Sequence, residues 1–229
     1  GGIGIDMEAP ASMVTVAGNS IAGNAGLGIE LRNALNGSGI SENDPNDLDA
    51  GANGLQNFPE ISAVTVLPAS VKIEGSLDVP LIGLNFNYDL RAFASSECDP
   101  MGNGEGETYL GTERVDFGGT EDFSITLPVQ VEPGAAITMT ATSVILGTTS
   151  EFSDCFVLPI PLLCGDATLD GEIAAGDALL ALRTAVGTAT CDLCICDVQG
   201  SGTVTATDAL LILRFAVGQM VLLDCAACE

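Results

Sequence analysis

The spacing of hydrophobic residues changes twice along this chain, and each change predicts a different kind of structure. Up to about residue 60, short apolar segments alternate with Gly and Asn. Between residues 61 and 157, apolar and polar residues take turns, as in Val71–Gly75, which is typical of half-buried strands. After residue 164, apolar residues recur at helical spacing in two runs. The expected fold is therefore mainly β with a small α-helical module at the C-terminal end.

The first predicted domain, residues 1–60, contains an internal repeat. Gly2–Met7 returns 24 residues later as Gly26–Leu31, and Asn19–Asn24 lies between the two copies. A period in the twenties predicts stacked coils of a parallel β-helix. Asn at the corners fits this interpretation, because Asn tolerates left-handed backbone conformations. Two ordinary β-hairpins are the alternative.

The second predicted domain, residues 61–157, has the pattern of an antiparallel β-sandwich with immunoglobulin-like topology. Short alternating segments are separated there by turn residues. The expected strands are Ile61–Leu67, Val71–Leu77, Leu84–Ala94, Thr108–Phe117, Asp122–Leu127, Ile137–Val144 and Thr148–Phe152.

The third predicted domain, residues 164–229, carries two copies of a twelve-residue loop. Loop 1 is Asp166–Asp177 and loop 2 is Asp197–Asp208, with oxygen-bearing side chains at loop positions 1, 3, 5 and 12 and Gly at position 6. Ca²⁺ prefers about six to eight oxygen ligands, which a sharply turning loop can bring together. We therefore predict one Ca²⁺ in each loop. The expected ligands are Asp166, Thr168, Asp170, Glu172 and Asp177 in loop 1, and Asp197, Gln199, Ser201, Thr203 and Asp208 in loop 2.

The two loops differ in charge. Glu172 and Thr203 are expected to contribute backbone carbonyls, and loop 2 has the neutral Gln199 and Ser201 at positions 3 and 5. Fewer carboxylates predict weaker Ca²⁺ binding in loop 2. A chance turn that holds no ion is the alternative for both loops.

Each loop is followed by a predicted helix. Residues 178–187 match residues 209–218 in pattern, and both runs end in a glycine suited to a helix C-cap. Ile173 and Val204 are expected to pair across the two loops as a short β-bridge.

This duplicated unit resembles a type I dockerin, whose paired F-hands bind two Ca²⁺ and dock onto a cohesin. The pairs that often carry cohesin specificity in that family correspond to Ala175-Gly176 and Ala206-Thr207. The usual polar pair is missing from the first repeat, so the resemblance leaves the partner open.

Residues 43–59 resemble the segment that closes the right-handed parallel β-helix of large secreted bacterial proteins and leads into a sandwich domain. Within it, Asp44, Asp47, Asp49 and Asn53 can hold a further Ca²⁺, with a solvated polar turn as the alternative. Residues 94–99 and 148–155 resemble that sandwich domain. The resemblance implies a disulfide between Cys98 and Cys155.

The other six cysteines lie in the last domain, at positions 164, 191, 194, 196, 225 and 228. Two Cys-x-x-Cys pairs can indicate a Zn²⁺ site. Beside calcium loops, disulfides are the favoured interpretation, and their pairing cannot be read from spacing. An even total of eight cysteines fits an oxidising compartment.

Composition narrows the function. A net charge of −25, from 31 acids and six bases, argues against nucleic-acid binding and docking on anionic membranes. The chain has no His, which excludes His-based catalysis and His-ligated metals. It has no apolar run near the roughly 20 residues of a membrane span. Because it begins with Gly1 and shows no signal peptide, we expect a mature product whose leader is removed.

These features predict a non-catalytic, calcium-binding structural or adhesive protein of the bacterial cell exterior. Two β-helix coils need neighbours, so the chain is expected to form a homopolymer, such as a filament, or to come from a longer β-helix protein. The alternative is the C-terminal docking region of a larger secreted enzyme or adhesin that binds a cohesin scaffold. A polysaccharide-cleaving enzyme is the weakest hypothesis, because so few coils offer no substrate groove.

Overall fold

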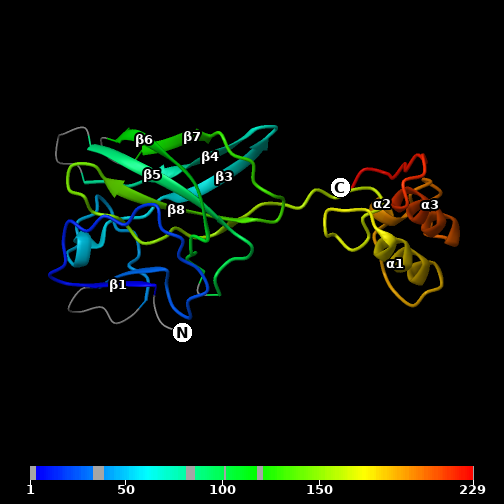
Figure 1. The fold of residues 1–229 in the computed structure, drawn as a ribbon, viewed down its shortest axis with the longest axis horizontal. Helices are drawn as coiled ribbons and strands as arrows, with labels where there is room; N and C mark the ends of the chain where they lie inside the picture. Colours follow the sequence, from blue (N-terminus) through cyan, green and yellow to red (C-terminus); the bar gives the residue numbers. More distant parts are fainter. Residues whose placement is uncertain (1–3, 33–38, 81–85, 101, 118–120, 229) are drawn as a thin grey trace. The chain divides into compact units, whose positions relative to one another are not determined.

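The computed structural model describes residues 4–32, 39–80, 86–100, 102–117 and 121–228. The protein is mainly β, with its α-helices near the C-terminal end, as predicted (Figure 1). It forms two compact units, Gly1–Leu158 and Pro159–Glu229. The boundary expected near residue 60 falls inside the first unit.

The N-terminal repeat forms a two-stranded parallel sheet. Strand β1 (Ile5–Glu8) pairs with β2 (Ile29–Arg32) in the register that places Ile5 opposite Ile29. This confirms the offset of the repeat for the residues described, while Gly2 and Ile3 lie outside them. Met7, Ile29 and Leu31 turn inward and are buried. The described chain shows this sheet and no stack of β-helix coils.

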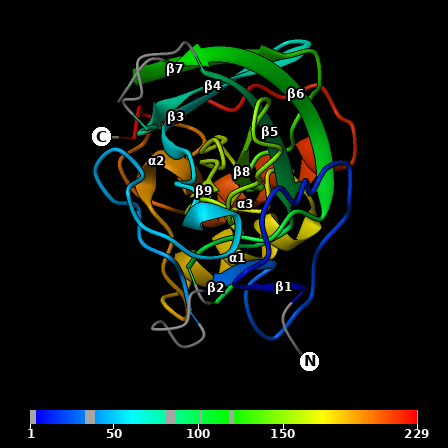
Figure 2. The same ribbon diagram turned by 90° about the vertical axis from the view of Figure 1, so that its left-hand side faces the viewer.

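The rest of the first unit is an antiparallel sandwich of two open sheets (Figures 1 and 2). One sheet has the order β3-β4-β7 and the other has the order β6-β5-β8-β9. The strands are β3 (Glu60–Leu67), β4 (Ser70–Leu77), β5 (Phe86–Ser95), β6 (Thr108–Phe117), β7 (Glu121–Leu127), β8 (Ala136–Ser143) and β9 (Phe156–Val157). Six of the seven predicted strands are confirmed within a residue or two, except that residues 84 and 85 of the third lie outside the described chain.

The seventh expected strand, Thr148–Phe152, is wrong as a continuous strand, although Thr149 forms an isolated antiparallel bridge with Thr142. Backbone contacts with β8 remain, such as the bond from the Ser150 amide to the Ala141 carbonyl at 2.9 Å, but serine hydroxyls interrupt them. The amide of Ala141 donates to Ser150 Oγ at 3.0 Å, and the amide of Met139 donates to Ser153 Oγ at 2.9 Å. Residues 148–153 therefore run beside β8 without forming a continuous strand. The short strand β9 pairs with the first residues of β8 instead.

Strand β8 is buried along its whole length, because both of its faces are covered. Ile137 and Met139 belong to the core between the two sheets, together with Leu90 from the neighbouring strand β5 and Ile73 from β4 of the other sheet. The alternating threonines lie on the other face, where Thr138 Oγ1 donates to the carbonyl of Glu105 at 2.8 Å. The Thr side chains therefore belong to a second packed layer rather than to a solvent-exposed face.

That second layer is a joint core between the N-terminal sheet and the sandwich. Its buried members are Met7, Val16, Ile21, Ile29, Leu31, Ala52, Leu55, Phe93 and Phe152. The short 3-10 helix η1 (Ala52–Leu55) adds hydrogen bonds to this layer through Asn53. Asn53 Oδ1 accepts from the amide of Val14 at 2.9 Å, and its Nδ2 donates to the carbonyl of Thr149 at 3.0 Å. The N-terminal region is thus bound to the sandwich by both apolar and polar contacts.

The second unit is a small helical module made of α1 (Ala175–Ala185), α2 (Leu193–Cys196) and α3 (Ala206–Ala216). The two predicted helices are confirmed, and each begins three residues earlier than the apolar pattern indicated. Gly187 and Gly218 follow them with φ of 76° and 79°, as expected of C-cap glycines. The helix α2 was not predicted.

The β-bridge expected between Ile173 and Val204 is wrong for this structure. No backbone hydrogen bond joins these two residues, both of which lie in the described chain. Their side chains instead pack, partly buried, against the core of the module around Ala181 and Ile212.

Four disulfides use all eight cysteines. Cys98–Cys155 closes the first unit, as the resemblance implied. The module contains Cys164–Cys225, Cys191–Cys196 and Cys194–Cys228. Disulfide formation contradicts the Zn²⁺ alternative, because each Cys-x-x-Cys sulfur is bonded to a partner outside its own motif. Among the described residues, no helix is long and apolar enough to cross a membrane.

Candidate calcium sites

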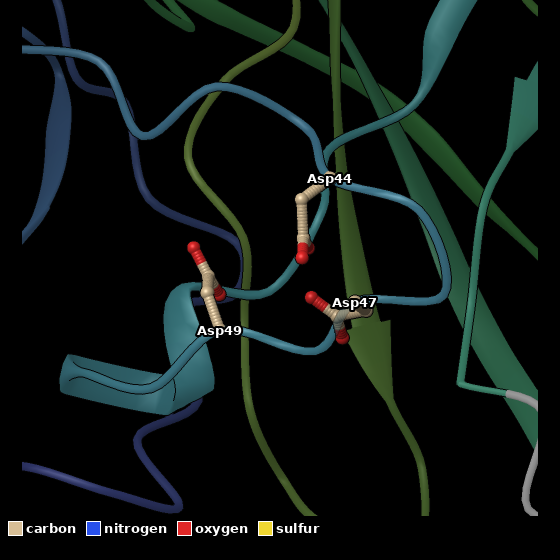
Figure 3. Close-up of side chains that lie close together, drawn as sticks. All are labelled: Asp44, Asp47 and Asp49. Atoms are coloured by element: carbon tan, nitrogen blue, oxygen red, sulfur yellow. The ribbon is translucent and has the colours of Figure 1, made fainter.

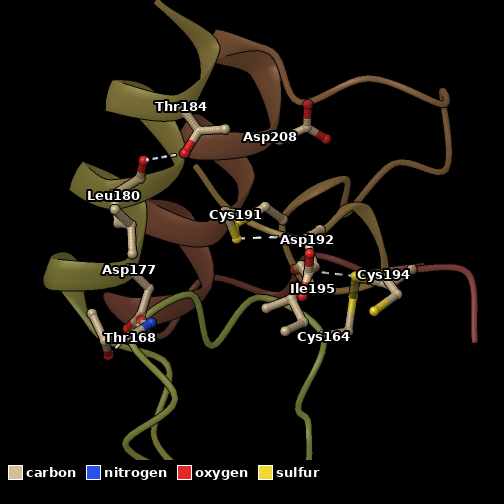
Figure 4. The surroundings of a disulfide bond; sticks show 12 residues. Cys164, Thr168, Asp177, Leu180, Thr184, Cys191, Asp192, Cys194, Ile195 and Asp208 are labelled. Carbon is tan, nitrogen blue, oxygen red and sulfur yellow. Dashed lines mark hydrogen bonds between the residues drawn. A yellow bond between two sulfur atoms is a disulfide. The ribbon is translucent and has the colours of Figure 1, made fainter. Parts of the chain in front are cut away.

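Loop 1 is organised around two buried aspartates at its ends. Asp166, at position 1, accepts from the amides of Asp170 and Gly171 at 3.2 and 2.8 Å. Asp177, at position 12, accepts from the amides of Thr168 and Ala174, both at 2.8 Å. Figure 4 shows Asp177 beside Thr168. Both aspartates are 0% exposed, so the turn encloses two carboxylates.

Loop 2 repeats the same connections at equivalent positions. Asp197 accepts from the amides of Ser201 and Gly202 at 2.9 and 2.5 Å. Asp208 accepts from the amides of Gln199 and Thr205 at 3.3 and 2.8 Å. The backbone around both loops therefore turns inward on the carboxylates of positions 1 and 12.

In each loop, hydrogen bonds lower the pKa of one of these two carboxylates. Burial acts to raise the pKa of Asp177, but the amides of Ala174 and Thr168 and the Thr168 hydroxyl outweigh it, and the pKa is lowered. In the same way, burial of Asp197 is outweighed by donors from Ser201 and Gly202, which lower its pKa. Each loop thus holds buried negative charge that no basic side chain of the described residues neutralises.

The oxygen donors of both loops fit a hard cation, but loop 1 carries more negative charge than loop 2. Loop 1 contains three aspartates, and loop 2 contains Asp197 and Asp208 with neutral oxygens from Gln199 and Ser201. The side chains at positions 3 and 5 of both loops are exposed, as are Glu172 and Thr203. The three carboxylates of loop 1 do not converge on one point to within the 4.8 Å found at another cluster. The structure therefore buries positions 1 and 12, while the intermediate side chains stay exposed to solvent and several of them, such as Thr168 and Ser201, hydrogen-bond to the buried aspartates.

That other cluster consists of Asp44, Asp47 and Asp49 (Figure 3). It is the one group of three acidic side chains, within the described parts of the chain, whose ligand oxygens lie within 4.8 Å of one another. Asp47 adopts a left-handed backbone with φ of 50°, which folds the segment back on itself. Asn57 stabilises the turn through two hydrogen bonds. Its side-chain Oδ1 accepts from the Asp44 backbone amide at 2.9 Å, and its backbone amide donates to Asp47 Oδ1 at 3.0 Å. Asn53, the fourth expected ligand, is committed elsewhere, to Val14 and Thr149.

The carboxylates of this cluster repel one another. Burial, together with the charges of Asp49, Asp44 and Asp78, raises the pKa of Asp47 to about 6 against the lowering effect of the Asn57 amide. Burial and Asp44 likewise raise the pKa of Asp49. A divalent cation would relieve this repulsion, so the donor chemistry of the cluster fits Ca²⁺ as well.

A further buried carboxylate, that of Glu151, accepts hydrogen bonds from backbone amides of the same unit. Glu151 Oε1 accepts from the Leu31 amide at 2.6 Å and Oε2 accepts from the Ser41 amide at 2.9 Å, with the residue 1% exposed. Burial raises its pKa to about 7, opposed by these two bonds and assisted by Glu30 and Glu42. Sequence reasoning missed Glu151, because nothing in its spacing distinguishes it from a surface glutamate.

We expect Glu151 to make the stability of the first unit depend on pH. Between its ordinary pKa of 4.5 and its folded value of about 7, the folded state binds more protons than the unfolded state. The free energy of unfolding should therefore fall as the pH rises through this window, by about 3 kcal/mol at most. Glu151→Gln should flatten that part of the slope in urea unfolding, and the exposed Glu132→Gln should leave it unchanged. Equal slopes in all three proteins would contradict the assignment.

The module also exposes an apolar face between its two long helices. Ala175, Ala178, Leu179 and Leu182 of α1 line a groove with Ala206, Ala209, Leu210 and Leu213 of α3. Each residue of one helix has its counterpart 31 positions later in the other. Leu179 and Leu210 remain 58% and 55% exposed. Sequence reasoning had assigned these leucines to the helix pattern without separating the exposed ones from the core.

No protein-family model and no curated protein matches this chain. Among solved structures, it has a weak similarity to the sensor domain of the anti-sigma factor RsgI4 in Pseudobacteroides cellulosolvens. The TM-score is 0.29 and the identity 16%, over 45% of this chain and 94% of that one. A TM-score this low defines neither the fold nor the function of the present protein.

Proposed function

We propose that this chain is a non-catalytic, calcium-binding structural or adhesive protein of the bacterial cell exterior. One observation carries the proposal: four buried aspartates occupy equivalent positions in two loops that have the same hydrogen-bond pattern. These aspartates are Asp166, Asp177, Asp197 and Asp208. Duplicated turns that enclose uncompensated charge support cation binding, because buried charges need a partner or a metal.

Other features support an extracellular setting and the finer fold assignment. Four disulfides are typical of oxidising compartments. The strand orders β3-β4-β7 and β6-β5-β8-β9 support an immunoglobulin-like sandwich. The loop–helix repeat supports the dockerin-like interpretation of the module. The parallel pairing of β1 with β2 supports the interpretation of the N-terminal region as the end of a β-helix.

We expect the oxidised chain to bind Ca²⁺ in both loops, with loop 1 tighter because it has more carboxylates. In titration calorimetry, Asp166→Asn should remove the tighter of these two events and Asp197→Asn the weaker one. Asp192→Asn is the matched control, because this exposed aspartate of the same module lies outside both loops. An intact chain that takes up no Ca²⁺ would overturn the proposal.

The cluster of Asp44, Asp47 and Asp49 is proposed to hold one further Ca²⁺. Asp47→Asn should then remove a binding event that neither loop variant affects. Because the pKa of Asp47 is about 6, binding near pH 6 should release protons, and the observed heat should vary with the ionisation enthalpy of the buffer. A stoichiometry of two in the wild-type chain would confine Ca²⁺ to the loops.

Self-assembly is proposed to proceed through the N-terminal sheet. Within the described residues, β1 has a strand partner on one edge, which is β2. A free strand edge is a template for another chain, and contact with a different surface of the next subunit would propagate a filament. Electron microscopy and sedimentation with and without EDTA test this idea. A chain that stays monomeric at high concentration in both conditions would exclude it.

Docking onto a cohesin-like scaffold is the second candidate function, favoured by the groove between α1 and α3. Arg183 and Arg214 directly follow the groove residues Leu182 and Leu213 in sequence, and they form none of the ion pairs found among the described residues. We expect capture on immobilised cohesin domains in Ca²⁺ but not in EDTA. The pair Leu179→Ser and Leu210→Ser should abolish capture, whereas Leu193→Ser on α2, also exposed, should not. Absence of capture would leave the structural function as the remaining candidate.

A further inference from the structure

The disulfides of the module lie where the chain passes into the two calcium loops. Cys196 immediately precedes Asp197, the first residue of loop 2, and Cys164 lies two residues before Asp166, the first residue of loop 1. Cys164, Cys191 and Cys194 pack, partly buried, against the module core that contains Ile195 (Figure 4). Both position-1 aspartates are therefore attached to a cross-linked backbone.

Loop 2 depends on a local cross-link. Cys191 and Cys196 are bonded across a separation of five residues and enclose the short helix α2. The amide of Cys196 donates to the carbonyl of Asp192 at 2.9 Å, and the amide of Asp197 donates to that of Leu193 at 3.0 Å. The position of Asp197 is thus set by a single helical turn whose ends are joined covalently.

The C-terminal tail ties the two loops together. Cys225 is bonded to Cys164, which precedes loop 1. The neighbouring Asp224 donates its amide to the carbonyl of Val198, at position 2 of loop 2, at 2.8 Å. Gly165 in turn donates to the carbonyl of Ile195 in α2 at 2.8 Å. The C-terminal tail therefore joins both loops, and its bond from Cys228 to Cys194 also reaches α2.

The rigidity of a loop contributes most to Ca²⁺ affinity when the loop has few carboxylates. Ca²⁺ affinity rises with the number of carboxylates and with the preorganisation of the site. Loop 2 has two aspartates against three in loop 1, and it is the loop whose first ligand follows directly on a short disulfide ring. A flexible loop 2 would have to order itself when the ion binds, at the expense of affinity.

We propose that the Cys191–Cys196 disulfide couples Ca²⁺ binding in loop 2 to the oxidation state of the protein. This inference rests on the proposed calcium-binding function. Reduction by a dithiol breaks the S–S bond, forms two thiols with two electrons and two protons, and converts the dithiol into its cyclic disulfide. Loop 2 then loses its fixed first ligand. Loop 2 would therefore bind Ca²⁺ weakly in a reducing cytosol and fully only after oxidation outside the cell.

Linkage makes the coupling reciprocal. If oxidation tightens Ca²⁺ binding by some factor, Ca²⁺ must disfavour reduction of the same disulfide by that factor. Cys98–Cys155 lies in the other compact unit and provides an internal reference for this effect.

The first experiment compares Ca²⁺ titrations of the wild-type chain, the Cys191→Ser/Cys196→Ser variant and the Cys98→Ser/Cys155→Ser variant. We expect the weaker loop event to lose about tenfold or more in affinity in the first variant, with the tighter event retained. The second variant should bind as the wild type does. Absent binding by the wild-type chain would defeat the calcium function itself. Unchanged affinity in a folded Cys191→Ser/Cys196→Ser variant would overturn only the coupling.

The second experiment uses the wild-type chain and decides the matter if that variant fails to fold. The oxidised protein is incubated with dithiothreitol, with and without Ca²⁺, and free thiols are alkylated and assigned by peptide mass spectrometry. Ca²⁺ should slow reduction at Cys191 and Cys196 and leave that at Cys98 and Cys155 unchanged. Equal reduction at Cys191 and Cys196 in both conditions would overturn the proposal. Helical circular dichroism of each sample shows whether the module stays folded.

Discussion

Replacing Cys164 and Cys225 by serine is expected to lower the free energy of unfolding of the C-terminal module by about 4 kcal/mol. The two cysteines are 61 residues apart, so their bond closes a loop that spans nearly the whole module. A cross-link over such a span removes a large part of the conformational freedom of the unfolded chain. The buried core of the module is small and consists largely of Ala and Ile side chains, which leaves it little other stabilisation.

Urea unfolding followed by helical circular dichroism measures this effect, because the α-helices of the described chain all belong to the module. The matched control is Cys98→Ser/Cys155→Ser, whose cysteines are 57 residues apart in the first unit. This control should leave the helical transition in place. The measurement is made in EDTA, so that bound Ca²⁺ does not compensate for the loss. A helical transition that stays at the same urea concentration in the Cys164→Ser/Cys225→Ser variant would show that the Cys164–Cys225 bond stabilises little.

The strands that sequence predicted well are those whose alternation matches one buried face. In β4, Val71 and Ile73 are fully buried and alternate with Lys72 and Glu74. The helices were predictable for a related reason, because the apolar spacing of the second copy repeats that of the first. Their early starts were missed, since Ala175 and Ala206 precede the apolar run and belong to the helix only through the aspartates in the first turn.

Pattern reasoning failed where side chains replace backbone partners. The segment Thr148–Phe152 has β-type residues, but Ser150 and Ser153 offer hydroxyls that accept the amides of β8. Side-chain bonds to the backbone also help to join the N-terminal region to the sandwich, which the pattern did not predict. Asn53 looked like a calcium ligand in a polar run, whereas its amide binds the backbone of Val14 and Thr149.

The buried ends of the two candidate calcium loops were predictable from the repeat. Positions 1 and 12 of each loop are inward and buried, as the repeated spacing indicated. In both loops the end aspartates accept hydrogen bonds from the amides of positions 3, 5, 6 and 9, which follows from the equal loop length. Gly171 and Gly202, at position 6, both adopt positive φ. The module's disulfide pairing could not be read from sequence, because six cysteines permit many combinations and only the folded backbone selects among them.

Replacing Phe152 by alanine is expected to destabilise the first unit by about 4 kcal/mol. Phe152 is 2% exposed and stacks edge-on against Phe93, with their ring centroids 5.3 Å apart. A Cβ placed on Gly28 or Gly106 would lie 2.9 Å from its ring, so both glycines leave room for this side chain. The substitution would leave a cavity between the N-terminal sheet and the sandwich that the surrounding backbone cannot fill.

Tyr109→Ala is the matched control, because Tyr109 also packs on Phe93, at 5.6 Å, but is 45% exposed. Its loss should be within about 1 kcal/mol. Urea unfolding can be followed by tyrosine fluorescence, since Tyr88 is buried in the sandwich core. If the N-terminal sheet were an independent domain, Phe152→Ala would leave the transition reported by Tyr88 unchanged. A shift of that transition by the full amount would instead show that the sheet and the sandwich unfold as one cooperative unit.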